Sequence, residues 1–309
     1  KPIVLIGAGM NRTRIMNVDG ESILEYDCAD KLVLTNLSFF SLISKAKDKA
    51  TVSIRNGCLE MKSCSVVIEK TMHGFAPALL LERAQGSIEK CYIAGNTGTG
   101  IRLIGHSRFA IRKTLVEKTS GDGIKVESSR VSISDSVIAR NANGMFFESE
   151  YPCEAIRNHC VENNINGIVL KDSAQTILTS NNCNRNESSG ISYRGASSGA
   201  ARGNICKENK QQGIYLDGKA SPELLENKCN RNDGCGIAFF GESSGAARSN
   251  CCEENKQYGI YLGGKAAPEL IENNCNRNEF SGIAYRDESG GEARSNICKE
   301  NKRKGIYLD

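Results

Sequence analysis

The amino-acid sequence predicts an all-β solenoid of about 13 coils, each about 23 residues long, in which every strand pairs in parallel with its counterpart one coil later. Three observations support this prediction. A Gly followed by an apolar residue recurs at a nearly constant step, columns of Cys and Asn keep the same step, and the segments between turn residues are only three to six residues long. A helical repeat is disfavoured, because no segment carries a sustained 3.6-residue apolar stripe.

The recurring Gly defines the length of the coil. Ile follows this Gly in every copy except one, where Met145 takes its place. The step is 23 residues throughout, apart from a step of 21 between Gly123 and Gly144. The column consists of Gly100, Gly123, Gly144, Gly167, Gly190, Gly213, Gly236, Gly259, Gly282 and Gly305. Equivalent side chains of such coils stack at about 4.8 Å, the spacing of hydrogen-bonded strands.

A Cys column and two Asn columns keep the step of 23 without a gap. The Cys column runs through Cys160, Cys183, Cys206, Cys229, Cys252, Cys275 and Cys298, with Asn two residues before and three residues after each Cys. The coil therefore reads N-x-C-x-x-N-x-x-x-G-I. We expect the Cys and the preceding Asn to point into the coil, where Asn can hydrogen-bond the turn backbone and the Asn above and below it.

These N-x-C-x-x-N-x-x-x-G-I coils resemble the repeats of right-handed parallel β-helix proteins: the pectin-lyase-like superfamily, periplasmic copper-maturation β-helix proteins and F-box proteins with such repeats. The opening run from Lys1 to Gly9 is also similar to the first coil of many such folds. The resemblance implies one continuous right-handed parallel β-helix, with less regular coils over 1–99 and regular 23-residue coils over 100–309. It implies the architecture more strongly than an activity, because this fold hosts lyases, hydrolases, epimerases and non-catalytic scaffolds.

The amino-acid composition and net charge limit the classes of partner that we expect. Of the 309 residues, 39% are hydrophobic and 25% are charged, and the net charge is only +4. No apolar stretch is long enough for a transmembrane helix, and the mixed charge favours no nucleic acid, so we expect neither membrane nor nucleic acid as a partner. Because the sequence begins at Lys1 and stops within a repeat, we expect it to be a piece of a longer chain.

The 14 Cys are interpreted as mostly free thiols. Cys occupies an inward position that would otherwise take Ile or Val, and a free Cys packs as a small apolar residue. Disulfides between stacked coils and adventitious metal binding remain alternatives. No C-x-x-C occurs, and the three His share no spacing with the Cys column, so we expect no metal and no cofactor. Free thiols favour a reducing, cytoplasmic location.

Two outward columns alternate in sign from coil to coil. The position two after each Cys reads Arg185, Glu208, Arg231, Glu254, Arg277 and Glu300, and the position four after each Cys reads Glu187, Lys210, Asp233, Lys256, Glu279 and Lys302. Alternation gives each charge two opposite neighbours, so these residues are predicted to set the register of the coils. They are therefore poor candidates for catalysis.

The strand that follows each Gly-Ile is the candidate binding face, because its outward positions combine aromatic and charged side chains. Tyr215, Tyr261 and Tyr307 are two coils apart, a predicted spacing of about 10 Å that is similar to a disaccharide step. The alternative is that these Tyr shield the sheet or contact another protein. The predicted binding residues are Arg102, Lys125, Glu127, Phe146, Glu148, Lys171, Arg194, Tyr215, Asp217 and Tyr261.

The 46-residue copies are nearly identical, which favours a non-catalytic binding or scaffolding role toward a carbohydrate or protein partner. A multivalent binder gains affinity from several equivalent sites, whereas catalysis needs one unique site. The alternative is a lyase, hydrolase or epimerase of an acidic polysaccharide. Its site would lie at the irregular 21-residue coil, where a regular pattern is broken. The candidate residues there are His106, Arg108, Arg112, Lys113, Asp122, Lys125 and Glu127.

Overall fold

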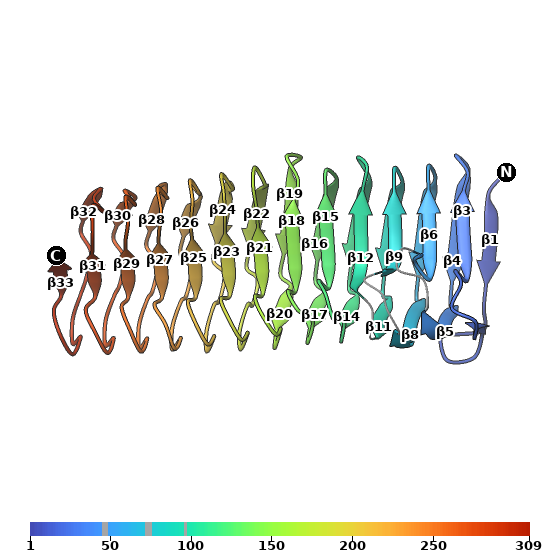
Figure 1. The fold of residues 1–309 in the computed structure, drawn as a ribbon, viewed down its shortest axis with the longest axis horizontal. Coiled ribbons are helices and arrows are strands. Elements are labelled where there is room, and N and C mark those ends of the chain that lie inside the picture. The colour runs from blue at the N-terminus through green and yellow to red at the C-terminus, as the bar shows by residue number, and fades with distance from the viewer. Residues whose placement is uncertain (45–48, 72–75, 96–97) are drawn as a thin grey trace. The chain divides into compact units, whose positions relative to one another are not determined.

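The computed structural model describes residues 1–44, 49–71, 76–95 and 98–309, and the elements found in them are β-strands. They form two compact units, residues 1–153 and 154–309. In each unit the strands stack in parallel, turn upon turn (Figure 1). The predicted all-β parallel solenoid is confirmed. Among the described residues, no helix is long and apolar enough to cross a membrane.

Unit 1 has three strands per turn, and each strand pairs with the strand of the same kind in the next turn. Sheet A of this unit has the order β1 (Ile3–Ile6), β4 (Lys31–Thr35), β7 (Cys58–Lys62), β10 (Gln85–Glu89), β13 (Arg108–Arg112) and β16 (Arg130–Ser134). Sheet B has the order β2 (Arg14–Asn17), β5 (Ser38–Ser44), β8 (Ser65–Thr71), β11 (Tyr92–Gly95), β14 (Leu115–Glu117) and β17 (Val137–Ala139). Sheet C has the order β3 (Leu24–Asp27), β6 (Val52–Arg55), β9 (Pro77–Glu82), β12 (Thr99–Ile104), β15 (Ile124–Glu127) and β18 (Met145–Glu148).

Unit 2 repeats sheets A and C with shorter strands. Sheet A has the order β19 (Cys153–Ile156), which begins at the last residue of unit 1, then β22 (Gln175–Thr179), β24 (Ser198–Arg202), β26 (Glu223–Leu225), β28 (Ala246–Arg248), β30 (Glu269–Ile271) and β32 (Glu292–Arg294). Sheet C has the order β21 (Ile168–Leu170), β23 (Ile191–Tyr193), β25 (Ile214–Leu216), β27 (Ile237–Phe239), β29 (Ile260–Leu262), β31 (Ile283–Tyr285) and β33 (Ile306–Leu308). The third side holds β20 (His159–Val161) and isolated bridges such as Asn182↔Ile205.

The three-residue strands of sheet C follow from the alternation of side chains along a strand. In β25, Ile214 and Leu216 are fully buried, while Tyr215 between them is only half-buried. Chain direction changes at corners where a non-Gly residue takes a left-handed conformation, as Arg231 does with φ 55°. Inward Ile, Leu and Phe residues thus form the core, and the intervening residues form the outer face.

Both Asn columns of unit 2 are hydrogen-bonded in series, and their members up to Asn273 and Asn278 are buried. The Nδ2 of Asn204 donates to the Oδ1 of Asn227 at 3.0 Å, and in the second column Asn232 donates to Asn255 at 3.1 Å. The Nδ2 groups of these columns also donate to backbone carbonyls of the preceding turn. The Nδ2 of Asn227, for example, donates to the carbonyl of Ala201 at 2.8 Å. Each Asn therefore ties its own turn to the turns on either side.

The Cys column lies between the Asn columns and explains the recurring Gly. All 14 Cys are free thiols, and those of the column from Cys160 to Cys275 are fully buried. A Cβ on Gly213 would lie 2.6 Å from the carbonyl oxygen of Gly236 and 2.8 Å from the Cβ of Cys229. No side chain fits at this close approach, so the position requires Gly.

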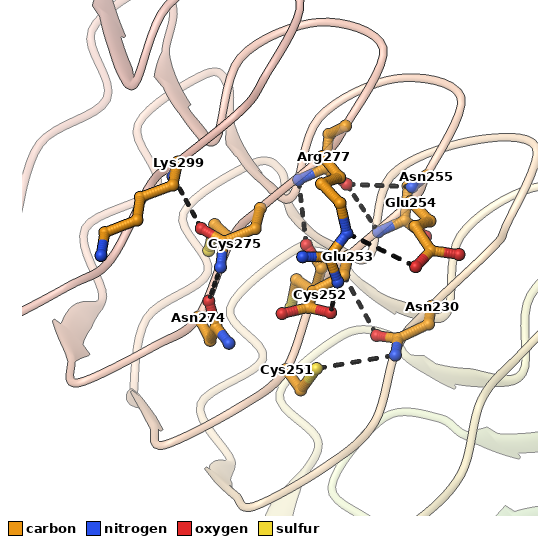
Figure 2. A network of polar contacts seen from close by, with 12 residues as sticks. Asn230, Cys251, Cys252, Glu253, Glu254, Asn255, Asn274, Cys275, Arg277 and Lys299 are labelled. Carbon is orange, nitrogen blue, oxygen red and sulfur yellow. Dashed lines mark hydrogen bonds and ion pairs between the residues drawn. The ribbon is translucent and has the colours of Figure 1, made fainter.

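The sign-alternating columns form ion pairs between neighbouring turns. Arg185 pairs with Glu162 at 3.1 Å, and Lys256 pairs with Asp233 at 2.8 Å. Figure 2 shows Arg277 between Glu253 and Glu254, at 2.5 Å and 3.5 Å. Except for Glu253, which is largely buried, these side chains are substantially exposed, so each exposed pair contributes only about 0.2–1 kcal/mol and its larger effect is on register.

Candidate functional site

The predicted residues of unit 1 converge on sheet C. Arg102, Lys125 and Phe146 are aligned on neighbouring strands, and Glu127 is aligned with Glu148. Glu127 accepts from Arg102 Nε at 2.6 Å and lies 3.1 Å from Lys125 Nζ. The Lys125 ammonium also stands 5.5 Å from the centre of the Phe146 ring. Glu127 thus contacts both cations, and its single negative charge offsets one of their two positive charges.

Two carboxyl groups near this cluster have pKa values displaced in opposite directions. Burial raises the pKa of Asp122, which accepts a hydrogen bond from Asn143 at 2.8 Å. Burial also disfavours the charged Glu127, but its contacts with Arg102 and Lys125 outweigh this and lower its pKa. Enzymes that use acid–base catalysis contain pairs of carboxyl groups whose pKa values are displaced in opposite directions.

The other residues named for catalysis are not gathered around Asp122. Arg108 and Arg112 lie on β13 in sheet A, whereas Lys125 and Glu127 lie on β15 in sheet C. His106, at the corner between the two sheets, packs edge-on against Tyr151 with ring centres 5.5 Å apart. Lys113 follows β13 in a left-handed conformation. Sequence proximity groups these residues, but the corners of the coil distribute them over different sides.

The predicted residues of unit 2 lie in two columns of sheet C. Tyr215 and Tyr261 are on the strands, both in register with Ala238 between them. Lys171, Arg194 and Asp217 directly follow their strands; Lys171 lies 3.5 Å from Asp172, and Arg194 donates to the hydroxyl of Ser192 at 3.1 Å. Burial, followed by the nearby Asp217, raises the pKa of Tyr215.

Tyr215 and Tyr261 are joined by a third ring, in contrast to the separate platforms that the two-coil spacing suggests. Phe240, which directly follows β27, places its ring 5.6 Å from Tyr215 and 5.1 Å from Tyr261. Ala238 is too small to fill the space between the two Tyr, and Phe240 fills it. Tyr258 and Phe280 extend the row: the ring centre of Tyr258 lies 5.4 Å from that of Tyr261, and the ring centre of Phe280 lies 5.2 Å from that of Tyr258.

We name Tyr215, Phe240, Tyr261, Tyr258 and Phe280 the aromatic row. All five side chains are half-buried, so their rings retain an accessible face. Phe240, Tyr258 and Phe280 were missed as site residues in the sequence. For Tyr258 a signal is its place directly before Gly259, where other copies have Gln212 and Ser281, and for Phe280 it is its place two residues before Gly282, where other copies have Gln211 and Gln257.

Comparison with known proteins gives one family match. The model described as "Right handed beta helix region" matches residues 48–183 and 166–309. No curated protein matches the chain by sequence.

Solved structures share the fold at low sequence identity. The periplasmic alginate epimerase AlgG has a TM-score of 0.64 at 14% identity, over 100% of this chain and 77% of that one. The A-module of the mannuronan C-5 epimerase AlgE6 from Azotobacter vinelandii has a TM-score of 0.64 at 11% identity, over 100% of this chain and 91% of that one. The catalytic unit of an α-1,3-glucanase from Streptomyces thermodiastaticus has a TM-score of 0.54 at 12% identity, over 94% and 64%. At these identities the likeness is one of fold.

Proposed function

This chain belongs to the right-handed β-helix family, and from that premise we propose that it binds a polysaccharide along sheet C of unit 2 without cleaving it. The surface proposed for binding is the aromatic row with the neighbouring polar residues Arg194 and Asp217.

The aromatic row is the observation that carries this proposal. Its ring centres are 5.1–5.6 Å apart, so the rings support one another as a continuous strip. Rings held in this way lose little conformational freedom on binding, and their accessible faces suit the C–H faces of sugar rings. Arg194 and Asp217 supply hydrogen-bonding groups beside the strip. A linear glycan matches such a strip better than a compact ligand does.

Two further observations support a glycan binder. The 46-residue copies repeat the Tyr-containing strand at Tyr215, Tyr261 and Tyr307, so one polymer can contact equivalent groups several times over. The names of the similar structures include an alginate epimerase, a mannuronan epimerase and a glucanase, all of which describe proteins that act on polysaccharides. This fits a saccharide ligand on the same kind of scaffold.

The test is a glycan-binding screen with the wild type and a Tyr215→Ala, Tyr261→Ala double variant. We expect the wild type to bind at least one polysaccharide, and the double variant to lose about 2–4 kcal/mol of binding free energy if both rings are anchors. A Tyr92→Ala, Tyr151→Ala variant removes two Tyr outside the row and serves as the control. Binding of every hit as tightly by the folded double variant as by the wild type would refute the proposal. Binding to a protein partner and to no glycan would replace it with the protein-binding alternative.

A catalytic role is the second candidate, and the opposed pKa displacements of Asp122 and Glu127 favour it. In such a reaction Lys125 and Arg102 would lie beside an acidic sugar, while Asp122 would hold or release a proton. Incubation with polyuronates distinguishes the reactions: a lyase forms a new reducing end together with an unsaturated product, a hydrolase forms reducing ends without unsaturation, and an epimerase exchanges a ring proton with solvent deuterium without cleaving the chain. A product that Asp122→Asn abolishes would support catalysis, and the lack of all three signals over prolonged incubation would argue against it.

A further inference from the structure

We infer that the last turns of unit 2 contain a pocket for a single acidic sugar unit; this inference rests on the proposed function and gives it a ligand class. The cavity measures about 150 Å³ and is lined by Tyr258, Ser281, Arg286, Arg303, Lys304 and Tyr307. Its lining combines aromatic rings with three cationic side chains.

Small residues in the middle turn create the hollow. Tyr258, Ser281 and Lys304 directly precede the Gly of three successive turns, so the small Ser281 lies between two long side chains. On the adjoining strands, Ala284 is in register with Tyr307. Ser281 and Ala284 are both buried, and Ser281 lines the cavity together with Tyr258 of the preceding turn and Lys304 and Tyr307 of the following one.

An equivalent position one copy earlier is filled by an aromatic ring. There, the small residue is Ala238, and Phe240 lies over it between Tyr215 and Tyr261. The residue that corresponds to Phe240 beside Ala284 is Arg286, 46 positions later. Its guanidinium lies instead 4.6 Å from the centre of the Tyr307 ring and bonds to Asp309. The chain therefore closes the first space with Phe and lines the second with a cation.

Two more cations occur where the repeat has neutral residues. Arg303 corresponds to Gln257 one copy earlier, and Lys304 corresponds to Gln212 two copies earlier. Arg303 lies 4.3 Å from the centre of the Phe280 ring, and Lys304 lies 5.1 Å from that of Tyr307. Within the part of the chain that the structure describes, neither forms a salt bridge, unlike Lys302 next to them, which pairs with Glu279 at 2.5 Å.

The ligand class follows from this combination. Three cations line the cavity, and the carboxylate of Asp309 pairs with one of them, Arg286, so the lining favours an anion. Guanidinium groups bind planar oxyanions such as carboxylate through paired hydrogen bonds. The flanking Tyr rings add flat apolar walls, which suit a sugar ring better than a small inorganic ion. The volume accommodates one pyranose unit. A uronic acid residue within a glycan meets all three conditions.

The experiment compares tetragalacturonate with its methyl ester, which has the same rings and no charge. We expect the wild type to prefer the acid form, and an Arg303→Gln, Lys304→Gln variant to bind it about tenfold or more weakly while leaving the ester unaffected. Both substitutions restore residues that the repeat itself uses, so the fold should be retained. A Lys219→Gln, Lys256→Gln variant has the same change of net charge away from the pocket and should bind as the wild type does.

A third variant, Arg286→Phe, introduces the residue of the equivalent position and should also abolish the preference for the acid. Equal binding of acid and ester by the wild type would overturn the inference while leaving the proposed glycan binding intact. Sulfate that competes as strongly as the tetramer would also overturn it, since it would indicate a general anion site. Failure of the wild type to bind any glycan would refute the proposed function and this inference together.

Discussion

The side-chain Nδ2 of Asn227 lies 3.0 Å from the Oδ1 of Asn250, and both side chains are fully buried. The Oδ1 of Asn227 in turn accepts from the backbone N and the Nδ2 of Asn204, at 2.9 and 3.0 Å. One side chain thus satisfies groups in its own turn and in both neighbours. Repetition of this arrangement makes each turn depend on the next.

We predict that Asn227→Ala is strongly destabilising. The substitution leaves two donors of Asn204 and the carbonyl of Ala201 without these partners inside the coil, and each buried unsatisfied group costs about 1–3 kcal/mol. We therefore expect a loss of more than about 3 kcal/mol in the free energy of unfolding, measured by urea titration. Lys228→Ala, at an exposed position of the same turn, is the control and should cost less than about 0.5 kcal/mol. A cost for Asn227→Ala similar to that of the control would contradict the prediction.

Phe240 is predicted to hold the aromatic row together. Phe240→Ala removes two ring contacts, each contributing about 0.5–1.5 kcal/mol, so we expect a loss of about 1–3 kcal/mol in unfolding free energy. Phe240→Leu keeps apolar bulk over Ala238 and should lose less. An unchanged urea midpoint for Phe240→Ala would show that Tyr215 and Tyr261 are held independently of the intervening ring.

The thiols are predicted to differ sharply in reactivity. Burial raises the pKa of Cys235 and of Cys91 to about 12, whereas Cys28 is exposed. Because the thiolate is the reactive form, Ellman's reagent should modify Cys28 rapidly in the native protein and the buried column only after denaturation. Under denaturing, non-reducing conditions we expect most of the 14 thiols to react, as suits the reducing compartment that we propose. Recovery of fewer than about half would contradict this.

Asp122 and Glu127 are predicted to influence stability with opposite signs. The folded-state pKa of Glu127 is lowered, so its stabilising contribution is present above the unfolded pKa and is lost as the pH falls through the folded pKa. The folded-state pKa of Asp122 is raised, so its favourable contribution exists at low pH and is lost as the pH rises through the folded pKa.

At pH 7 we therefore expect Glu127→Gln to destabilise the protein by about 1 kcal/mol, and Asp122→Asn to be neutral or stabilising. The destabilisation by Glu127→Gln should shrink in acid. Urea titrations at neutral and acidic pH check both variants, and effects of the same sign at pH 7 would contradict the assigned environments.

Much of the fold could be predicted because residues one repeat apart in the sequence are neighbours in the structure. The step of 23 residues places Cys160 and Cys183, and likewise Asn158 and Asn181, at equivalent positions of successive turns. The alternation of Ile214, Tyr215 and Leu216 then specifies which side chains face inward. Positions related by a constant step need no knowledge of distant contacts, since the neighbour of each residue is the residue one coil away.

The candidate site was less predictable, because its contacts join positions that differ in the repeat. Phe240 reaches Tyr215 and Tyr261 only because Ala238 leaves space. Glu127 pairs with Arg102 although it lies on the next strand, two residues beyond the position aligned with Arg102. The binding residues predicted along sheet C remain predictions that the glycan experiments test.

The sequence by itself determined the coil period, the parallel pairing and the inward columns of this protein, because a periodic chain repeats the same local interactions at every turn. Only the tertiary structure decided how the outward side chains lean, pair and leave space between turns. Long side chains such as Arg286 and Phe240 occupy corresponding positions of the coil and point to different partners. Their direction depends on the volume and charge of neighbours in adjacent turns, which the register of the strands brings together and the order of residues along the chain does not specify.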